Sequence, residues 1–153
     1  MKKKIGIGIV AFLIIAQFFR IDKENPAVIA ENDFIVAEKV DPKVAHLLKA
    51  SCYDCHSNES AYPWYTNIAP VSWWVKNHIN EGREELNFSD WSEYSDRRKH
   101  HKLEECIELI EEGEMPLSTY TLMHGDAKLD DAQQQLLINF FQSEMKKFEG
   151  ESN

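Results

Sequence analysis

Two cysteines and a histidine lie close together in the segment Cys52-Tyr53-Asp54-Cys55-His56. Cysteines three residues apart that are followed at once by a histidine form the attachment signature of a c-type haem. The two thiols can add to the haem vinyl groups as thioethers, and the imidazole can bind the iron from below. With three cysteines and six histidines in 153 residues, the chain would contain this pattern by chance roughly 0.002 times. The segment therefore predicts one covalently attached haem.

Three other uses of these cysteines compete with haem attachment. A structural zinc site needs a second pair of ligands at a fixed spacing, and the third cysteine, Cys106, stands alone in the sequence. A thioredoxin-like redox pair needs a βαβ context, which the surrounding sequence does not offer. A Cys52–Cys55 disulfide in a haem-free structural module stays open as an alternative, but it leaves His56 without a role.

Residues 1–20 have the composition of a targeting segment, with three lysines before an apolar run at residues 5–19. A fifteen-residue helix spans about 22 Å, less than the bilayer core of about 30 Å, which favours a cleaved signal peptide. The nearest small-residue cleavage site, residues 28–30, lies ten residues beyond the run, so we favour an uncleaved anchor in the inner membrane. In both cases the lysines stay in the cytoplasm and the rest is exported. We therefore expect a location in the bacterial periplasm or cell envelope, where c-type haem is attached.

The rest of the chain is long enough for one domain. We interpret residues 21–40 as a tether whose apolar patch, Phe34-Ile35-Val36, docks on the domain edge. Residues 41–149 are the expected domain, and residues 150–153 a frayed C-terminus. Beyond residue 20 the chain has 13 basic and 26 acidic residues, a net charge of −13. This charge argues against nucleic acid and against an anionic membrane surface as partners. It suits a basic or neutral protein partner, which for a haem protein would be a redox partner, or it simply keeps the chain soluble.

The spacing of apolar residues predicts an all-α domain with no sustained alternating stretch. Helices are expected at residues 41–51, 72–86, 98–112 and about 130–145. Asp41 is the expected N-cap of the first helix and Pro42 its first-turn residue. We expect the first and last helices to pack against each other near the haem. Because haem would supply much of the core, the haem-free chain should be poorly folded.

A distal iron ligand is expected after the third helix. Gly113 ends that helix, and Pro116 restricts Met115 to an extended conformation, from which its thioether can point into a pocket. Met123 is the rival methionine, because the loop that carries it can also cover the distal face. The aromatic loop at residues 57–70 is expected to wrap one face and edge of the haem.

The sequence resembles the class I cytochrome c superfamily, and more narrowly the small single-haem "haem-binding domain" proteins of bacterial envelopes. The resemblance covers residues 41–148. It is carried by Cys52-Tyr53-Asp54-Cys55-His56, Gly113-Glu114-Met115-Pro116, a capped apolar C-terminal helix, Tyr62-Pro63-Trp64-Tyr65, Trp73-Trp74 and Asp126-Ala127-Lys128-Leu129. The long insertion between the histidine and the methionine departs from the superfamily pattern.

The resemblance implies a cytochrome c-like fold around one haem and a role for each motif residue. Cys52 and Cys55 would hold the haem, His56 would be the proximal ligand of the iron, and Met115 the distal one. In the superfamily a proline carbonyl tends to accept the proximal histidine's Nδ1–H, and such a bond orients the ring. Pro70 is our first candidate for this carbonyl, and Pro63 is the second.

Two functional hypotheses follow if haem is bound. Histidine–methionine ligation fills both axial positions of the iron and suits one-electron transfer, so we favour an electron carrier over an enzyme. A peroxidase-like haem enzyme, or a gas or redox sensor, would instead need an open distal site with polar groups, such as His78 or His124, close by. The sequence shows no Ser-His-Asp arrangement and no glycine-rich phosphate loop.

Overall fold

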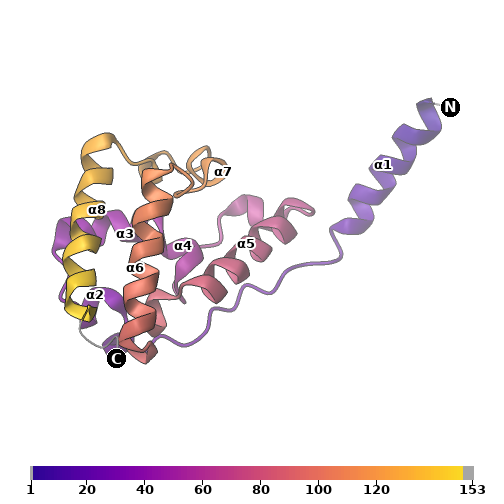
Figure 1. The fold of residues 1–153 in the computed structure, drawn as a ribbon. Coiled ribbons are helices and arrows are strands. Elements are labelled where there is room, and N and C mark those ends of the chain that lie inside the picture. The colour runs from indigo at the N-terminus through magenta and orange to yellow at the C-terminus, as the bar shows by residue number, and fades with distance from the viewer. Residues whose placement is uncertain (1, 150–153) are drawn as a thin grey trace.

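The computed structural model describes residues 2–149, and every regular element in this range is a helix. Figure 1 shows a packed body of helices and an N-terminal helix that extends away from it. The expectation of an all-α fold is confirmed. The expected frayed segment, residues 150–153, lies outside the described residues.

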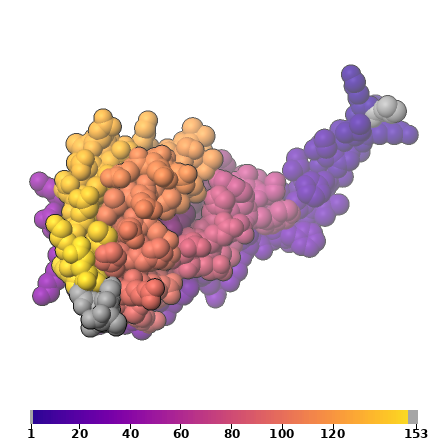
Figure 2. Space-filling view, viewed as in Figure 1, coloured from indigo at the N-terminus to yellow at the C-terminus, as the bar shows by residue number. Residues whose placement is uncertain are grey.

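Helix α1 (Lys2–Ala16) forms the extended arm, and its residues are exposed except for Ala16. The arm is separate from the body in both overall views (Figures 1 and 2). Among residues 2–149, no helix has both the length and the apolar character needed to cross a bilayer.

The segment at residues 30–37 is part of the packed body. It forms a 3-10 helix, η1 (Ala30–Asn32), and a short helix, α2 (Phe34–Ala37). Asp33 caps α2 by accepting the Ile35 N–H at 2.9 Å, and the Tyr53 hydroxyl donates to the same carboxylate oxygen at 3.1 Å. Phe34 is fully buried and packs edge-on against Trp91 with ring centroids 4.7 Å apart. The apolar patch thus enters the core through Phe34, where we had expected it to dock on the domain edge.

Helix α3 (Pro42–Ser51) begins as predicted, with the Asp41 side chain accepting the Lys43 N–H at 2.9 Å and Pro42 in the first turn. Its apolar stripe is buried at Val44, Leu47 and Leu48. Helix α4 (Tyr53–His56) follows after Cys52 and forms a single turn. The 3-10 helix η2 (Trp64–Asn67) lies within the aromatic loop.

Two longer helices follow, α5 (Val71–Glu85) and α6 (Asp96–Glu111). The polar stretch between them forms a 3-10 helix, η3 (Phe88–Glu93), and it contains Trp91, which is fully buried. Helix α6 starts slightly before its expected position because the Ser95 side chain caps it by accepting the Arg98 N–H at 3.3 Å.

The C-terminal part contains α7 (Ser118–Thr121), η4 (Gly125–Ala127), α8 (Asp131–Met145) and η5 (Lys146–Phe148). Asp130 and Gln133 cap α8 reciprocally at 2.8 and 2.9 Å, which satisfies two backbone donors. Helix α8 contacts α3, as expected, but it packs most extensively along α6; the two run side by side in Figure 1.

Replacement of Phe34 by alanine tests whether the segment before residue 41 contributes to the core. The Phe34→Ala variant should lose about 3–5 kcal/mol of unfolding free energy, because it leaves a cavity among packed aromatic rings. The exposed Val36, two residues away in α2, provides the control, and Val36→Ala should change stability by less than about 0.5 kcal/mol. Chemical denaturation of both variants measures the difference. Equal effects would show that the segment is only a tether.

Candidate functional site

The turn between α3 and α4 brings the two motif cysteines and the histidine together. The Cys52 N–H donates to the Leu48 carbonyl at 2.9 Å and so continues α3, while the His56 N–H donates to the Cys52 carbonyl at 2.9 Å and closes α4. Cys52 and Cys55 are both free thiols. The structure therefore has no disulfide between them, and both sulfurs are available for other bonds.

Both motif thiols are protonated at neutral pH. Burial raises the pKa of Cys52 to about 12, and burial together with the charge of Asp54 raises the pKa of Cys55 to about 11. A structural zinc site needs a second pair of ligands beside these thiols. No group of three or more metal-ligating side chains occurs between residues 2 and 149, so the described residues do not supply such a pair.

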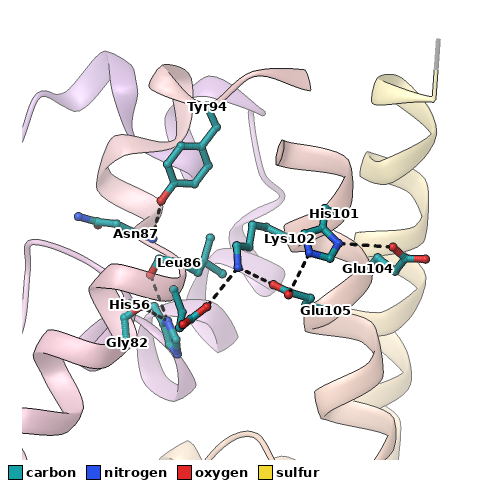
Figure 3. Close-up of polar contacts among 10 residues, drawn as sticks. His56, Gly82, Leu86, Asn87, Tyr94, His101, Lys102, Glu104 and Glu105 are labelled. Carbon is teal, nitrogen blue, oxygen red and sulfur yellow. Dashed lines mark hydrogen bonds and ion pairs between the residues drawn. The ribbon is translucent and has the colours of Figure 1, made fainter. Parts of the chain in front are cut away.

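The imidazole of His56 is held by two backbone carbonyls from the end of α5. Its Nδ1 lies 2.9 Å from the Gly82 carbonyl oxygen and 3.1 Å from the Leu86 carbonyl oxygen (Figure 3). Both partners are acceptors, so Nδ1 carries the proton, and the lone pair is on Nε2. Burial lowers the pKa of His56, which favours the neutral ring. A neutral imidazole with a free Nε2 and an anchored Nδ1–H has the form that an iron ligand requires.

The prediction of a proline carbonyl as the acceptor of the His56 Nδ1–H is wrong. The Pro70 carbonyl accepts the Trp73 and Trp74 N–H groups at 3.1 and 3.3 Å, at the beginning of α5. The Pro63 carbonyl accepts the Thr66 N–H at 3.0 Å and the Thr66 hydroxyl at 2.6 Å. Both carbonyls therefore satisfy local turns.

Gly82 is the site residue that sequence reasoning missed. A Cβ atom added there would lie 2.8 Å from the Cys55 carbonyl oxygen, so only glycine allows α5 to approach α4 this closely. The available signal was a single glycine inside a helical pattern, which often has a packing reason.

A network of hydrogen bonds fixes the end of α5 around His56. The Asn87 N–H donates to the Tyr94 hydroxyl at 2.9 Å, directly after Leu86 (Figure 3). On α6, the largely buried Lys102 amine bonds to Glu85 at 3.4 Å and to Glu105 at 2.6 Å. Burial alone would lower the pKa of Lys102, but the two carboxylates raise it overall. The charged lysine thus joins α5 to α6 on the side of the imidazole.

A cavity of about 280 Å³ adjoins the motif at Cys55. Its lining is mostly apolar and aromatic and comes from α5, the aromatic loop and the α7 region; it includes Val71, Trp74, Val75, Ile79, Leu117 and Met123. Of the four residues expected to hold haem, Cys55 alone is in this lining. Cys52 and His56 flank α4 residues that line the cavity but are not in the lining themselves, and Met115 is two residues from Leu117 in the sequence.

Polar side chains also reach this cavity. His78 is in its lining, and the buried His78 Nδ1 has no hydrogen-bond partner among the described residues, with a Glu81 carboxylate oxygen 3.6 Å away.

The Tyr65 hydroxyl lies 2.6 Å from His124 Nε2. Tyr120 stacks on the His124 ring at 4.3 Å and donates to Asp54 of the motif at 2.8 Å. This chain of contacts connects the motif, the α7 region and the aromatic loop.

Met115 follows the predicted turn at the end of α6. Gly113 has a φ of 71°, in the region that favours glycine. The N–H groups of Glu114 and Met115 both donate to the Leu109 carbonyl, at 2.9 and 3.0 Å. These bonds hold the backbone of Met115, whose side chain is half-buried.

A family model described as a haem-binding domain matches residues 11–143. The chain belongs to the haem-binding domain family. No curated protein and no solved structure gives a significant match. The match supports haem as the cofactor, and it covers the motif, the cavity and the segment that carries Met115.

The residues at the site fit a haem group. Two free thiols lie one helical turn apart, and a neutral imidazole with an unprotonated Nε2 follows them. Beside them is a cavity whose apolar and aromatic walls suit a flat macrocycle. This set of donors and walls has the chemical character that a haem group needs, and it does not resemble a site for a small hydrated cation.

The close approach at Gly82 gives a direct test of this geometry. Gly82→Ala should reduce the unfolding free energy by about 1–3 kcal/mol, because the added methyl group overlaps the Cys55 backbone. In the haem-loaded protein the shifted carbonyl should also change the reduction potential, since the Nδ1 bond tunes the ligand. Gly125→Ala is the control, because nothing lies within 4 Å of a Cβ there. Denaturation and redox titration measure both effects; an unchanged Gly82→Ala variant would show that the close packing is not required.

Proposed function

We propose that this haem-binding protein is a c-type cytochrome that carries single electrons in the bacterial cell envelope. The observation that carries the proposal is the double hydrogen bond from His56 Nδ1 to the Gly82 and Leu86 carbonyls, directly beside two free thiols. An imidazole held in this way is prepared to bind iron through Nε2. Haem iron, when bound, supplies a one-electron couple.

Cys52 and Cys55 hold one haem covalently in this proposal. Each thiol adds across one vinyl double bond, with the sulfur joining one carbon and the thiol hydrogen the other. The addition has no leaving group and needs no oxidant. The raised pKa values of both thiols keep these hydrogens in place at neutral pH. The α3–α4 turn fixes the spacing of the two sulfurs.

Met115 is the proposed second axial ligand. Its backbone is fixed by the Gly113 turn and by the bond to the Leu109 carbonyl, so little backbone entropy is lost on ligation. Met123 is in the cavity lining and its side chain is 53% exposed, which makes it the alternative. With a histidine and a thioether as ligands, the iron has no open position and suits electron transfer.

The proposed partner is a basic or neutral redox protein, in keeping with the net charge of −13 beyond residue 20. The proposed location is the outer side of the inner membrane, with residues 5–19 in contact with lipid.

One observation favours a second candidate function, a haem enzyme or gas sensor with an open distal site. His78 lines the cavity with a buried nitrogen that has no hydrogen-bond partner in the described part of the chain. Tyr65, whose hydroxyl pairs with His124, lines the same cavity. Such groups can bond a small polar ligand. This function requires that Met115 does not bind the iron.

Intact mass spectrometry tests the covalent attachment. Protein that matures in a host with c-type haem assembly should carry the mass of one haem. Cys52→Ala and Cys55→Ala should each retain at most one thioether, and the double variant should release haem under denaturing conditions because no thiol remains to hold it. Cys106→Ala is the matched control and should keep the full haem mass. A wild-type mass equal to that of the bare polypeptide would refute the proposal.

Paired methionine variants test the distal ligand. Met115→Ala should keep the haem but lose the far-red charge-transfer band of methionine-ligated ferric haem. The same variant should bind carbon monoxide in the reduced state and have a lower reduction potential. Met123→Ala should retain the band and the potential. The reverse result would identify Met123 as the ligand, and absence of the band from the wild type would support the enzyme or sensor.

A further inference from the structure

The apolar side chains of α1 are exposed on all sides of the helix. Residues 2–15 are all exposed, and they include Ile5, Ile7, Ile9, Val10, Phe12, Leu13, Ile14 and Ile15. The last four of these residues, from Phe12 to Ile15, are consecutive. Because one helical turn takes 3.6 residues, their side chains point to all sides of the helix. A helix that is apolar all round needs cover on every side, either inside a protein core or in lipid.

Hydrogen bonds join the end of α1 to the body. The Gln17 side chain makes two bonds to one residue, because its amide donates to the Ala69 carbonyl at 2.9 Å and its oxygen accepts the Ala69 N–H at 3.1 Å. The Trp73 indole donates to the Phe19 carbonyl at 2.7 Å. Ala16 is buried at this junction. The direction in which α1 leaves the body is therefore fixed.

Exposed apolar side chains surround this junction. We define the docking rim as Phe18, Phe19, Trp64, Ile68, Val71 and Trp74, whose exposed fractions lie between 44 and 82%. These residues come from the segment that follows α1, from η2 and the residue after it, and from the start of α5. Arg20 and Lys23 lie in the same region. Aromatic and basic residues together at the end of an apolar helix are typical of a membrane–water interface.

We infer that the docking rim contacts the surface of a lipid bilayer, so that the haem domain lies against the membrane with the start of α5 facing it. A protein partner or a second copy of the chain would cover one side of α1 and of the rim. Lipid covers all sides of α1 and continues onto the rim. The inference rests on the proposed location of α1 in lipid and adds that the domain itself touches the membrane.

The acidic character of the domain defines the kind of lipid contact. With a net charge of −13 beyond residue 20, the domain is not drawn to anionic lipid, so burial of apolar area must drive the contact. Interfacial side chains of this kind enter the headgroup region to a depth of about 5–10 Å. Val71 and Trp74 belong both to the rim and to the cavity lining, which places the cavity next to the membrane surface.

Photolabelling from the lipid tests the contact. Full-length, haem-loaded protein is reconstituted into phosphatidylcholine vesicles that contain a phospholipid with a diazirine on its acyl chain, and labelled peptides are mapped by mass spectrometry. Label is expected in α1 and in residues 62–75, and not in α8. Gln17→Ala should lose the label in residues 62–75 and keep it in α1, because the junction loosens. Gln142→Ala, on the exposed face of α8, should label like the wild type.

Three results would overturn the inference. Label in α1 alone would show that the rim does not touch lipid, while the proposed location of α1 stands. No label in either region, with the protein absent from the vesicle fraction, would refute both. If the rim stays unlabelled and a chemical crosslinker joins two copies of the protein on the vesicles, a second copy of the chain covers the rim.

Discussion

The close approach of α4 and α5 at Gly82 is the contact on which the site depends. Because residue 82 has no side chain, the last turn of α5 lies directly on the Cys55 backbone. The same approach places the Gly82 and Leu86 carbonyls on His56 Nδ1. One packing contact therefore sets both the position of the ring and its tautomer. The fold replaces the expected proline carbonyl with two carbonyls at the end of α5, and the Gly82 carbonyl accepts both the Leu86 N–H and the His56 Nδ1–H.

The features that sequence predicted well are local ones. The motif predicted haem as the cofactor, which the family match supports. The cap at Asp41 was predicted, because an N-cap side chain bonds to a backbone group two or three residues away, and the cap of α8 at Asp130 follows the same local rule. The all-α class followed from apolar spacing alone. In each case the interaction joins residues that are neighbours in the chain.

The features that sequence did not predict join distant segments. Phe34 resembled part of a tether, but its ring fills the core between η3 and α8, next to Trp91 and Phe141. The partners of His56 lie 26 and 30 residues away from it. A proline carbonyl was expected there by resemblance, but the Pro70 carbonyl is used at the start of α5. Such long-range choices depend on how helices pack, and periodicity gives only the face that packs.

The two candidate methionines differ in how the fold connects them to the motif. Met123 belongs to the α7 region, which Tyr120 joins to Asp54 of the motif at 2.8 Å. Met115 follows α6, which packs along α8 and is joined to α5 through Lys102. In the first connection the Tyr120 hydroxyl lies within hydrogen-bond distance of Asp54 and of the Ala50 carbonyl. The second combines the α6–α8 interface with an ion pair from the largely buried Lys102 to the exposed Glu85. A ligand that keeps the iron environment unchanged during electron transfer needs the more rigid support, and the α6 connection supplies it to Met115.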